Sequence, residues 1–135
     1  MLREVLFGKI HMACVTHCDP SYMGSITIDP DLLDEVGMVV NEKVLIADAT
    51  NGNRFETYIF RGEEGSRQIM VNGAAADLTG VGHRLLILSF CQLDQHELET
   101  HRPKVIICDE HNEIVKRLTY PASMSVPETI IPHTI

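Results

Sequence analysis

The chain has 135 residues, 44% of them hydrophobic, which is enough for one compact domain with a buried core. Its formal charge is −8 and it contains no long run of Lys or Arg, so we expect neither nucleic acid nor a membrane surface as a partner. No apolar run is long enough to span a bilayer and no secretory signal pattern is present. We therefore expect a cytoplasmic protein whose four cysteines are reduced.

Alternation of polar and apolar residues predicts strands along most of the chain. The first is expected at 4–16, followed by 25–28, 43–48, 54–60, 68–71, 84–92, 104–108 and 114–118. One helix is predicted between Asp29, a good N-cap, and Gly37, a good C-terminal stop, with Pro30 at its first position. Shorter helical turns are expected within 72–80 and 94–101. The pattern predicts a mainly β fold, a closed or nearly closed barrel with a few short helices.

The end of the chain differs in composition from the rest. Three of the six prolines lie between Leu118 and Ile135, which favours an extended or flexible tail over 119–135. Neither a repeat nor a linker divides the preceding part. We therefore expect a single domain over residues 1–118.

Two predicted strands carry cations next to groups that can exchange protons. Lys9 and His11 share one face of the first strand, and Arg54 and Tyr58 share one face of another. An Arg fork and a Lys point charge both suit carboxylates, and a phenol beside cations can donate a proton. Solvated cations and a half-buried tyrosine would give the same pattern, so both interpretations remain open here.

The first strand also carries residues that zinc prefers as ligands: His11, Cys14, His17 and Cys18. Strict alternation would place the two histidines on one face and the two cysteines on the other. The spacing matches no familiar zinc finger. We expect no metal, with a zinc-stabilised barrel as an alternative.

Two glycine-containing segments raise the question of a site. The segment "VNGAAADLTGVG" lacks dinucleotide-binding and P-loop spacing, but its tight turn could direct backbone N–H groups at a ligand, or could simply precede a helix. In "YMGSITID", the pair Gly24–Ser25 stands between apolar and β-branched residues where a strand rarely contains glycine. It is either a turn or bulge, or the position at which chemistry takes place.

Four motifs in sequence order carry a resemblance to a known family: "GKIH" at 8–11, "YMGSITID" at 22–29, "TNGNRFETY" at 50–58 and "VNGAAA" at 71–76. Together they closely resemble the aspartate decarboxylases, pyruvoyl-dependent enzymes that make β-alanine for pantothenate synthesis. The resemblance covers roughly residues 1–118. It implies a double-psi β-barrel assembled as a homotetramer, with active sites between protomers.

The resemblance also implies maturation by self-cleavage at Gly24–Ser25. In that family the serine hydroxyl attacks the glycine carbonyl, the resulting ester eliminates, and hydrolysis leaves a covalent pyruvoyl group, here at position 25. Glycine would allow its carbonyl to be approached and the backbone to bend. The same resemblance implies that Thr57 donates a hydrogen bond to the oxyanion that forms at the attacked carbonyl, and that Asn72 supports the site. Whether a maturation partner protein assists is left open.

The same resemblance implies how L-aspartate would be turned over. Its amine would form a Schiff base with the pyruvoyl ketone, and Tyr58 would return a proton after the α-carboxylate leaves. Lys9 and Arg54 would hold the carboxylates. The other expected contacts with substrate come from Thr57 and from the backbone of Gly73, Ala74 and Ala75.

Three further positions belong to the expected site without assigned roles. His11 and Tyr22 are neighbours, and Ala47 stands where relatives can carry an aromatic residue. An alternative is a processing-defective homologue that keeps the barrel and acts as a binding module. The presence of Ser25, Thr57 and Tyr58 argues against it.

Overall fold

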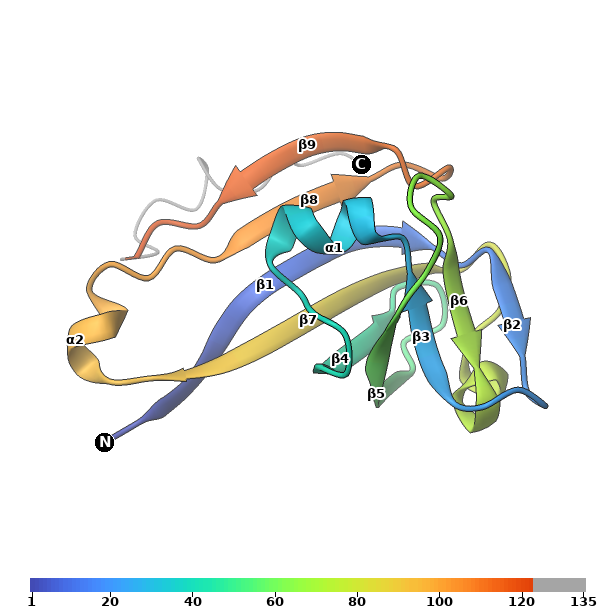
Figure 1. Cartoon of the computed structure of the whole chain (residues 1–135), viewed down its shortest axis with the longest axis horizontal. Coiled ribbons are helices and arrows are strands. Elements are labelled where there is room, and N and C mark those ends of the chain that lie inside the picture. Colours follow the sequence, from blue (N-terminus) through green and yellow to red (C-terminus); the bar gives the residue numbers. More distant parts are fainter. Residues whose placement is uncertain (123–135) are drawn as a thin grey trace.

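The computed structural model describes residues 1–122 (Figure 1). Its strands are β1 (Arg3–Cys14), β2 (His17–Asp19), β3 (Ser25–Ile28), β4 (Lys43–Asp48), β5 (Arg54–Arg61), β6 (Ile69–Asn72), β7 (Arg84–Leu93), β8 (Lys104–Cys108) and β9 (Ile114–Thr119). Its helices are α1 (Pro30–Val36), the 3-10 helix η1 (Gly73–Leu78) and α2 (Gln95–Leu98). The predicted mainly β architecture with a few short helices is confirmed.

The strand pairings close into a ring. The order is β2-β6-β3-β5-β4-β7-β1-β8-β9, and only Val15 and Thr16 separate β1 from β2 along the chain. This continuous segment therefore borders β7 at its start and β6 at its end. Backbone hydrogen bonds from Val15 N to His83 O and from Thr16 N to Ile69 O continue both contacts through the junction. The closed ring agrees with the expected double-psi barrel, and β8 and β9 extend it outside.

The interior of the ring is filled mainly by isoleucine. The strands contribute fully buried side chains that point into one cluster: Ile10, Ile26, Ile28, Ile46, Ile59, Ile69 and Ile87. Each such burial stabilises the fold by about 1.5–3 kcal/mol. Leu32, Leu33 and Val36 of α1 join the same cluster, so the helix covers part of the core.

Helix α1 begins and ends where the local sequence predicts. The Asp29 carboxylate accepts a hydrogen bond from Asp31 N at 2.9 Å and, being fully buried, also accepts from Gly65 N and Arg67 N. Gly37 ends the helix at a φ of 74°, with its N–H donating to Leu33 O. Asp29 thus joins the helix start to the loop before β6.

Strand β1 is not regular along its length. Its register with β7 shifts between Leu6 and Gly8 and again between Ile10 and Ala13, where Met12 has a φ of 65°. The strict alternation expected across the strand is therefore wrong beyond Met12. The prediction that Cys14, His17 and Cys18 lie on faces fixed by that alternation is wrong for the same reason. The short strand β2, which no sequence pattern predicted, follows the junction.

The far end of the described chain packs on the barrel. Strand β9 ends at Thr119, Tyr120 is buried beside Leu6 and Val105, and Tyr120 N donates to Pro103 O. The domain boundary after Leu118 stays a prediction, and the greater part of the expected tail, 123–135, lies outside the described residues. In 1–122 no helix is long and apolar enough to cross a membrane.

Candidate active site

Ser25 and Asn72 are direct cross-strand partners in the β3–β6 pair. Both are almost fully buried, with exposed fractions of 1% and 2%. The Ser25 Oγ and the Asn72 Oδ1 are also buried atoms with no hydrogen-bond partner among residues 1–122. An unpaired buried polar atom costs about 1–3 kcal/mol, so two of them side by side indicate a functional site.

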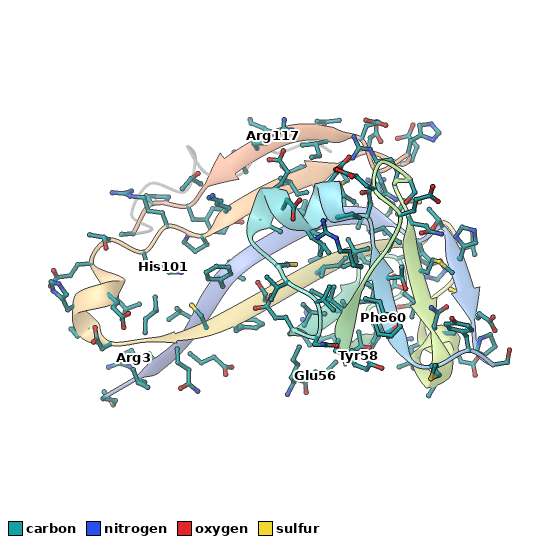
Figure 2. The ribbon with its side chains drawn as sticks, in the orientation of Figure 1. Arg3, Glu56, Tyr58, Phe60, His101 and Arg117 are labelled. Carbon is teal, nitrogen blue, oxygen red and sulfur yellow. The ribbon has the colours of Figure 1, made fainter. Side chains whose placement is uncertain are left out.

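Strand β5 lies on the other side of β3 and brings Thr57 and Tyr58 to the same place. In this parallel pair Ile26 is opposite Ile59; continued by one residue the register aligns Ser25 with Tyr58, and continued by two it aligns Gly24 with Thr57. The Tyr58 ring makes an edge contact with Phe60, at 5.9 Å between ring centroids, and the two side chains lie close together in Figure 2. Three sequence motifs therefore meet at the Gly24–Ser25 bond.

Thr57 and Tyr58 point to opposite faces of β5, as alternation predicts. Thr57 is half-buried, whereas Arg54 and Tyr58 are exposed. The register of β5 with β4 shows no bulge, so no local irregularity brings the three side chains to one face. Arg54 and Tyr58 therefore lie on one face of β5, and Thr57 lies on the other.

The glycine that follows Asn72 lies against the glycine that precedes Ser25. Gly73 has a φ of +79°, and a Cβ built there would be 2.5 Å from Gly24 Cα. Gly73 begins η1, of which Ala74 is exposed and Ala75 is half-buried against the core. The Asn72 side chain accepts no hydrogen bond from the N–H groups in the first turn of η1, so it does not compete with a ligand for them.

Arg54 is held near η1 by the turn that precedes it. The side chains of Asn51 and Asn53 both donate to Leu78 O, at 3.0 and 2.9 Å. The Asp48 carboxylate accepts from Thr79 Oγ1 at 2.7 Å, just beyond the end of η1. The motifs "TNGNRFETY" and "VNGAAA", which are separate in sequence, are thereby fastened together.

Asp48 makes several of the hydrogen bonds that connect these two segments, and no sequence pattern predicted this role. Besides Thr79 it accepts from His83 Nδ1 at 2.8 Å and from the backbone N–H groups of Thr50 and Asn51. Burial raises the pKa of Asp48, but the hydrogen bonds from His83, Thr79 and the backbone outweigh it and lower the pKa overall. Only the tertiary pairing reveals this role, because His83 precedes a strand distant in sequence.

Lys9 and His11 are not part of this cluster within one chain. Lys9 is in register with Leu88 of β7, and the strands β7 and β4 separate it from β5, about 14 Å measured along the sheet at about 4.8 Å per strand. Burial lowers the pKa of Lys9. Burial also lowers the pKa of His11 to about 4, and the positive charges of Lys9 and Arg84 act in the same direction. The two residues form a separate cationic group on β1.

Tyr22 does lie beside the cluster. It lines a hollow of about 440 Å³ together with Asn72 and Phe60. Ala47 is the cross-strand partner of Arg54 and is nearly buried. Of the positions without assigned roles, Tyr22 and Ala47 are therefore near the cluster and His11 is near Lys9.

A second feature that the sequence did not predict is an ion pair beside Tyr58. Lys43 is the cross-strand partner of Tyr58, and its Nζ lies 2.7 Å from Glu56 Oε2. These residues and Thr57 line an open hollow of about 310 Å³ on β4 and β5. Glu56 shares the face of Arg54 and Tyr58, so Lys43 neutralises the one carboxylate between them.

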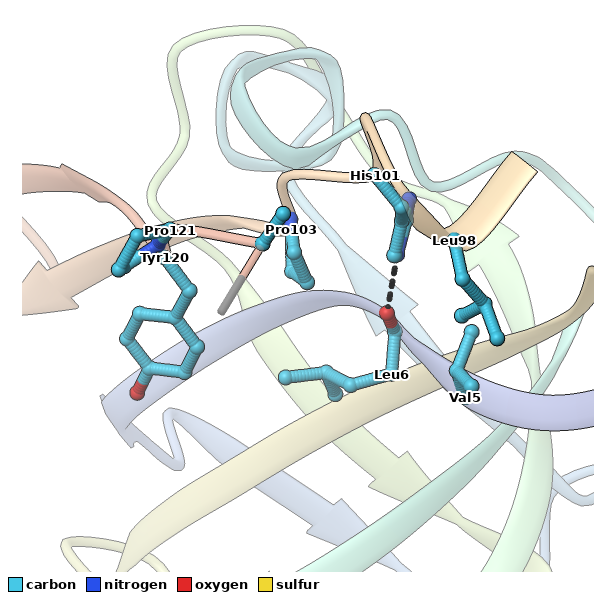
Figure 3. Close-up of a pocket in the computed structure, with 8 residues that line it drawn as sticks. Val5, Leu6, Leu98, His101, Pro103, Tyr120 and Pro121 are labelled. Atoms are coloured by element: carbon cyan, nitrogen blue, oxygen red, sulfur yellow. Dashed lines mark hydrogen bonds between the residues drawn. The ribbon is translucent and has the colours of Figure 1, made fainter. Parts of the chain in front are cut away.

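A different cavity, of about 260 Å³, is lined by residues outside the four motifs (Figure 3). Its walls are mainly apolar, with Leu6, Pro103 and Tyr120 among them, and His101 Nε2 lies 2.7 Å from Leu6 O. None of the four motifs contributes a residue to its lining. Nor do three His, Cys, Asp or Glu side chains within residues 1–122 converge to hold a metal ion.

Comparison with known proteins gives consistent similarities. The family model described as aspartate decarboxylase matches residues 1–115. The aspartate 1-decarboxylase of Caldicellulosiruptor saccharolyticus is 49% identical over 116 residues, covering 86% of this chain and 91% of that protein. That of Anoxybacillus flavithermus is 46% identical over 126 residues, covering 93% and 99%. Among solved structures, the computationally designed protein msDPBB_sym2 aligns with a TM-score of 0.41 and 14% identity, over 64% of this chain and 99% of that one.

Proposed function

The chain belongs to the aspartate decarboxylase family, and from this premise we propose that it matures by cutting itself between Gly24 and Ser25. Its activity is that of an aspartate 1-decarboxylase, a carboxy-lyase that forms β-alanine for pantothenate biosynthesis. The proposal concerns how residues of this chain carry out the maturation and the turnover.

The observation that carries the self-cleavage is the buried, unpaired Ser25 Oγ opposite the unpaired Asn72 Oδ1. Cβ atoms of cross-strand partners are about 5 Å apart. A rotamer change therefore lets Asn72 Oδ1 accept a hydrogen bond from the Ser25 hydroxyl and orient it. The Oγ then attacks the Gly24 carbonyl carbon, the C–N bond breaks, and the Oγ proton passes to the freed Ser25 nitrogen. Loss of the Ser25 α-proton expels the Gly24 carboxylate, and water releases ammonia.

Thr57 is suited to support the developing oxyanion. The β3–β5 register, continued by two residues from Ile26, aligns it with Gly24, whose carbonyl is attacked. Removal of one such donor typically slows a reaction by about 100- to 1000-fold. Thr57 is half-buried, which strengthens a hydrogen bond to a charge that forms there.

A pyruvoyl group at position 25 fits the residues present. Ser25 lies at the start of a strand with a buried backbone, and the small residues Gly73 and Ala74 follow its cross-strand partner. Such a group supplies a carbonyl that acts as an electron sink for decarboxylation. The protein's own contribution is to bind the two carboxylates of L-aspartate at different places and to supply a proton.

We assign the binding of L-aspartate to Arg54 and to the backbone N–H groups of Gly73, Ala74 and Ala75, because the Asp48 network fastens these two elements together. In residues 1–122 Arg54 has no ion-pair partner, and Lys43 engages the neighbouring Glu56. The Tyr58 hydroxyl is the proton donor, since Tyr58 is the side chain of β5 in register with Ser25.

Lys9 completes the site from another protomer. Within one chain two strands separate it from β5, yet it is a half-buried cation without an ion pair in the described part of the chain. A homotetramer with active sites between protomers would bring the Lys9–His11 group of one chain to the Ser25 cluster of the next. Light scattering of the purified protein tests this assembly.

Intact mass spectrometry under denaturing conditions tests the maturation. We expect Met1–Gly24 and a second species that starts at position 25 and is one ammonia lighter than a serine-headed chain. Ser25→Ala, which lacks the attacking hydroxyl, should remain a single inactive chain. An uncut wild type would contradict spontaneous cleavage. Addition of cell extract then separates a proenzyme that needs a maturation partner from a processing-defective binding module.

A further inference from the structure

The closest backbone approach at the cleavage site involves Gly73. A Cβ built at Gly73 would lie 2.5 Å from Gly24 Cα, 2.8 Å from Gly24 N and 3.3 Å from Tyr22 O. All three are main-chain atoms, which cannot swing aside as the end of a side chain can. The bare α-carbon of Gly73 is therefore in contact with the residue whose carbonyl Ser25 attacks.

Of the two glycines in contact, only Gly73 lacks room for a side chain. A Cβ built at Gly24 would meet Asn72 O at 3.7 Å and Gly73 Cα at 4.0 Å, both ordinary van der Waals contacts. Gly73 also has a φ of +79°, in the region that favours glycine, whereas Gly24 is not among the residues with positive φ. The sequence suggests that Gly24 is the small residue that cleavage needs, but the geometry places the steric demand on Gly73.

We propose that Gly73 is a positioning residue for self-cleavage: its missing side chain lets the Gly24 carbonyl stay where Ser25 Oγ can reach it. This inference rests on the proposed cleavage at Gly24–Ser25. Ser25 is held by its pairing with Asn72 of β6, and the next residue, Ile26, pairs with both β6 and β5, so a side chain at position 73 displaces Gly24 relative to Ser25. Restoring an ordinary contact requires a shift of about 1 Å, and a misplacement of that size can slow a reaction about 100-fold.

Gly65 offers a matched control. It has the same φ of +79°, but a Cβ there would meet no atom within 4 Å. Gly73→Ala and Gly65→Ala therefore introduce the same left-handed backbone strain, and only the first adds the steric push on Gly24. We expect both variants to fold, Gly65→Ala to cleave like the wild type, and Gly73→Ala to cleave about 100-fold more slowly by time-resolved intact mass.

A second pair, Gly73→Asn and Gly65→Asn, guards against a folding defect, because Asn adopts the left-handed region more readily than Ala. Position-73 variants that cleave within about threefold of their position-65 partners would overturn the inference. So would failure of both position-73 variants to fold beside folded position-65 variants, since Gly73 would then be required for folding. An uncut wild type refutes the proposed maturation itself, which keeps the two failures distinct.

Discussion

Asp48→Ala tests whether the turn before Arg54 is fastened to η1 as the structure indicates. The Asp48 carboxylate is nearly buried and accepts four hydrogen bonds, from Thr79 Oγ1, His83 Nδ1 and the backbone of Thr50 and Asn51. The two backbone donors lie in an exposed turn, where water replaces the lost acceptor. Thr79 and His83 are half-buried, so the loss of their bonds dominates, and we expect the free energy of unfolding to fall by about 3 kcal/mol.

Asp48→Asn is the conservative partner of this variant. The amide keeps the volume and retains one oxygen for the backbone donors, so we expect a loss of about 1 kcal/mol. Unfolding in urea should be measured in a Ser25→Ala background, where every chain stays uncut, and at one fixed protein concentration, because the unfolding of an oligomer depends on concentration. A loss below about 1 kcal/mol for Asp48→Ala would contradict the conclusion that its hydrogen bonds with Thr79 and His83 stabilise the fold.

The same variant separates binding from maturation. Because the network joins Arg54 to η1, Asp48→Ala should raise KM for L-aspartate by about tenfold, equivalent to about 1.4 kcal/mol of binding. Self-cleavage should continue, since Ser25 and Asn72 are paired on other strands. Asp109→Ala is the control: this carboxylate also accepts two backbone N–H groups in a turn, but away from the site. An unchanged KM in Asp48→Ala would refute the fastening role.

Two other predictions concern single side chains. Tyr58→Phe keeps the edge contact with Phe60 and should mature normally, while kcat falls by about 100-fold or more; normal turnover would exclude Tyr58 as proton donor. The pKa of His11 is lowered to about 4 from 6.5, so its stabilising effect is complete above pH 6.5 and is lost as the pH falls toward 4. His11→Gln should therefore lose less thermal stability than the wild type between pH 7 and pH 4.5, and equal losses would contradict the assignment.

Local physics determined most of the elements. The bounds of β3, β4 and β8 agree with the predicted ranges, because short apolar runs rich in β-branched residues between turn formers are typical of largely buried strands. Helix α1 lies between Asp29 and Gly37 because its cap and its left-handed stop act on neighbouring residues. In contrast, β2 and the bulge at Met12 arise from pairing with β6 and β7, and no short window of sequence contains those partners.

By itself, the sequence determined the family, because four short motifs occur in order and together contain the residues that we propose as nucleophile, proton donor and cations. Only the tertiary structure decided which of these residues meet. It brings Ser25 opposite Asn72 and beside Tyr58, separates Lys9 by two intervening strands, and places the steric demand on Gly73. The physical reason is that strand register and barrel closure are set by contacts between distant segments, and a motif specifies residue types without the distances between them.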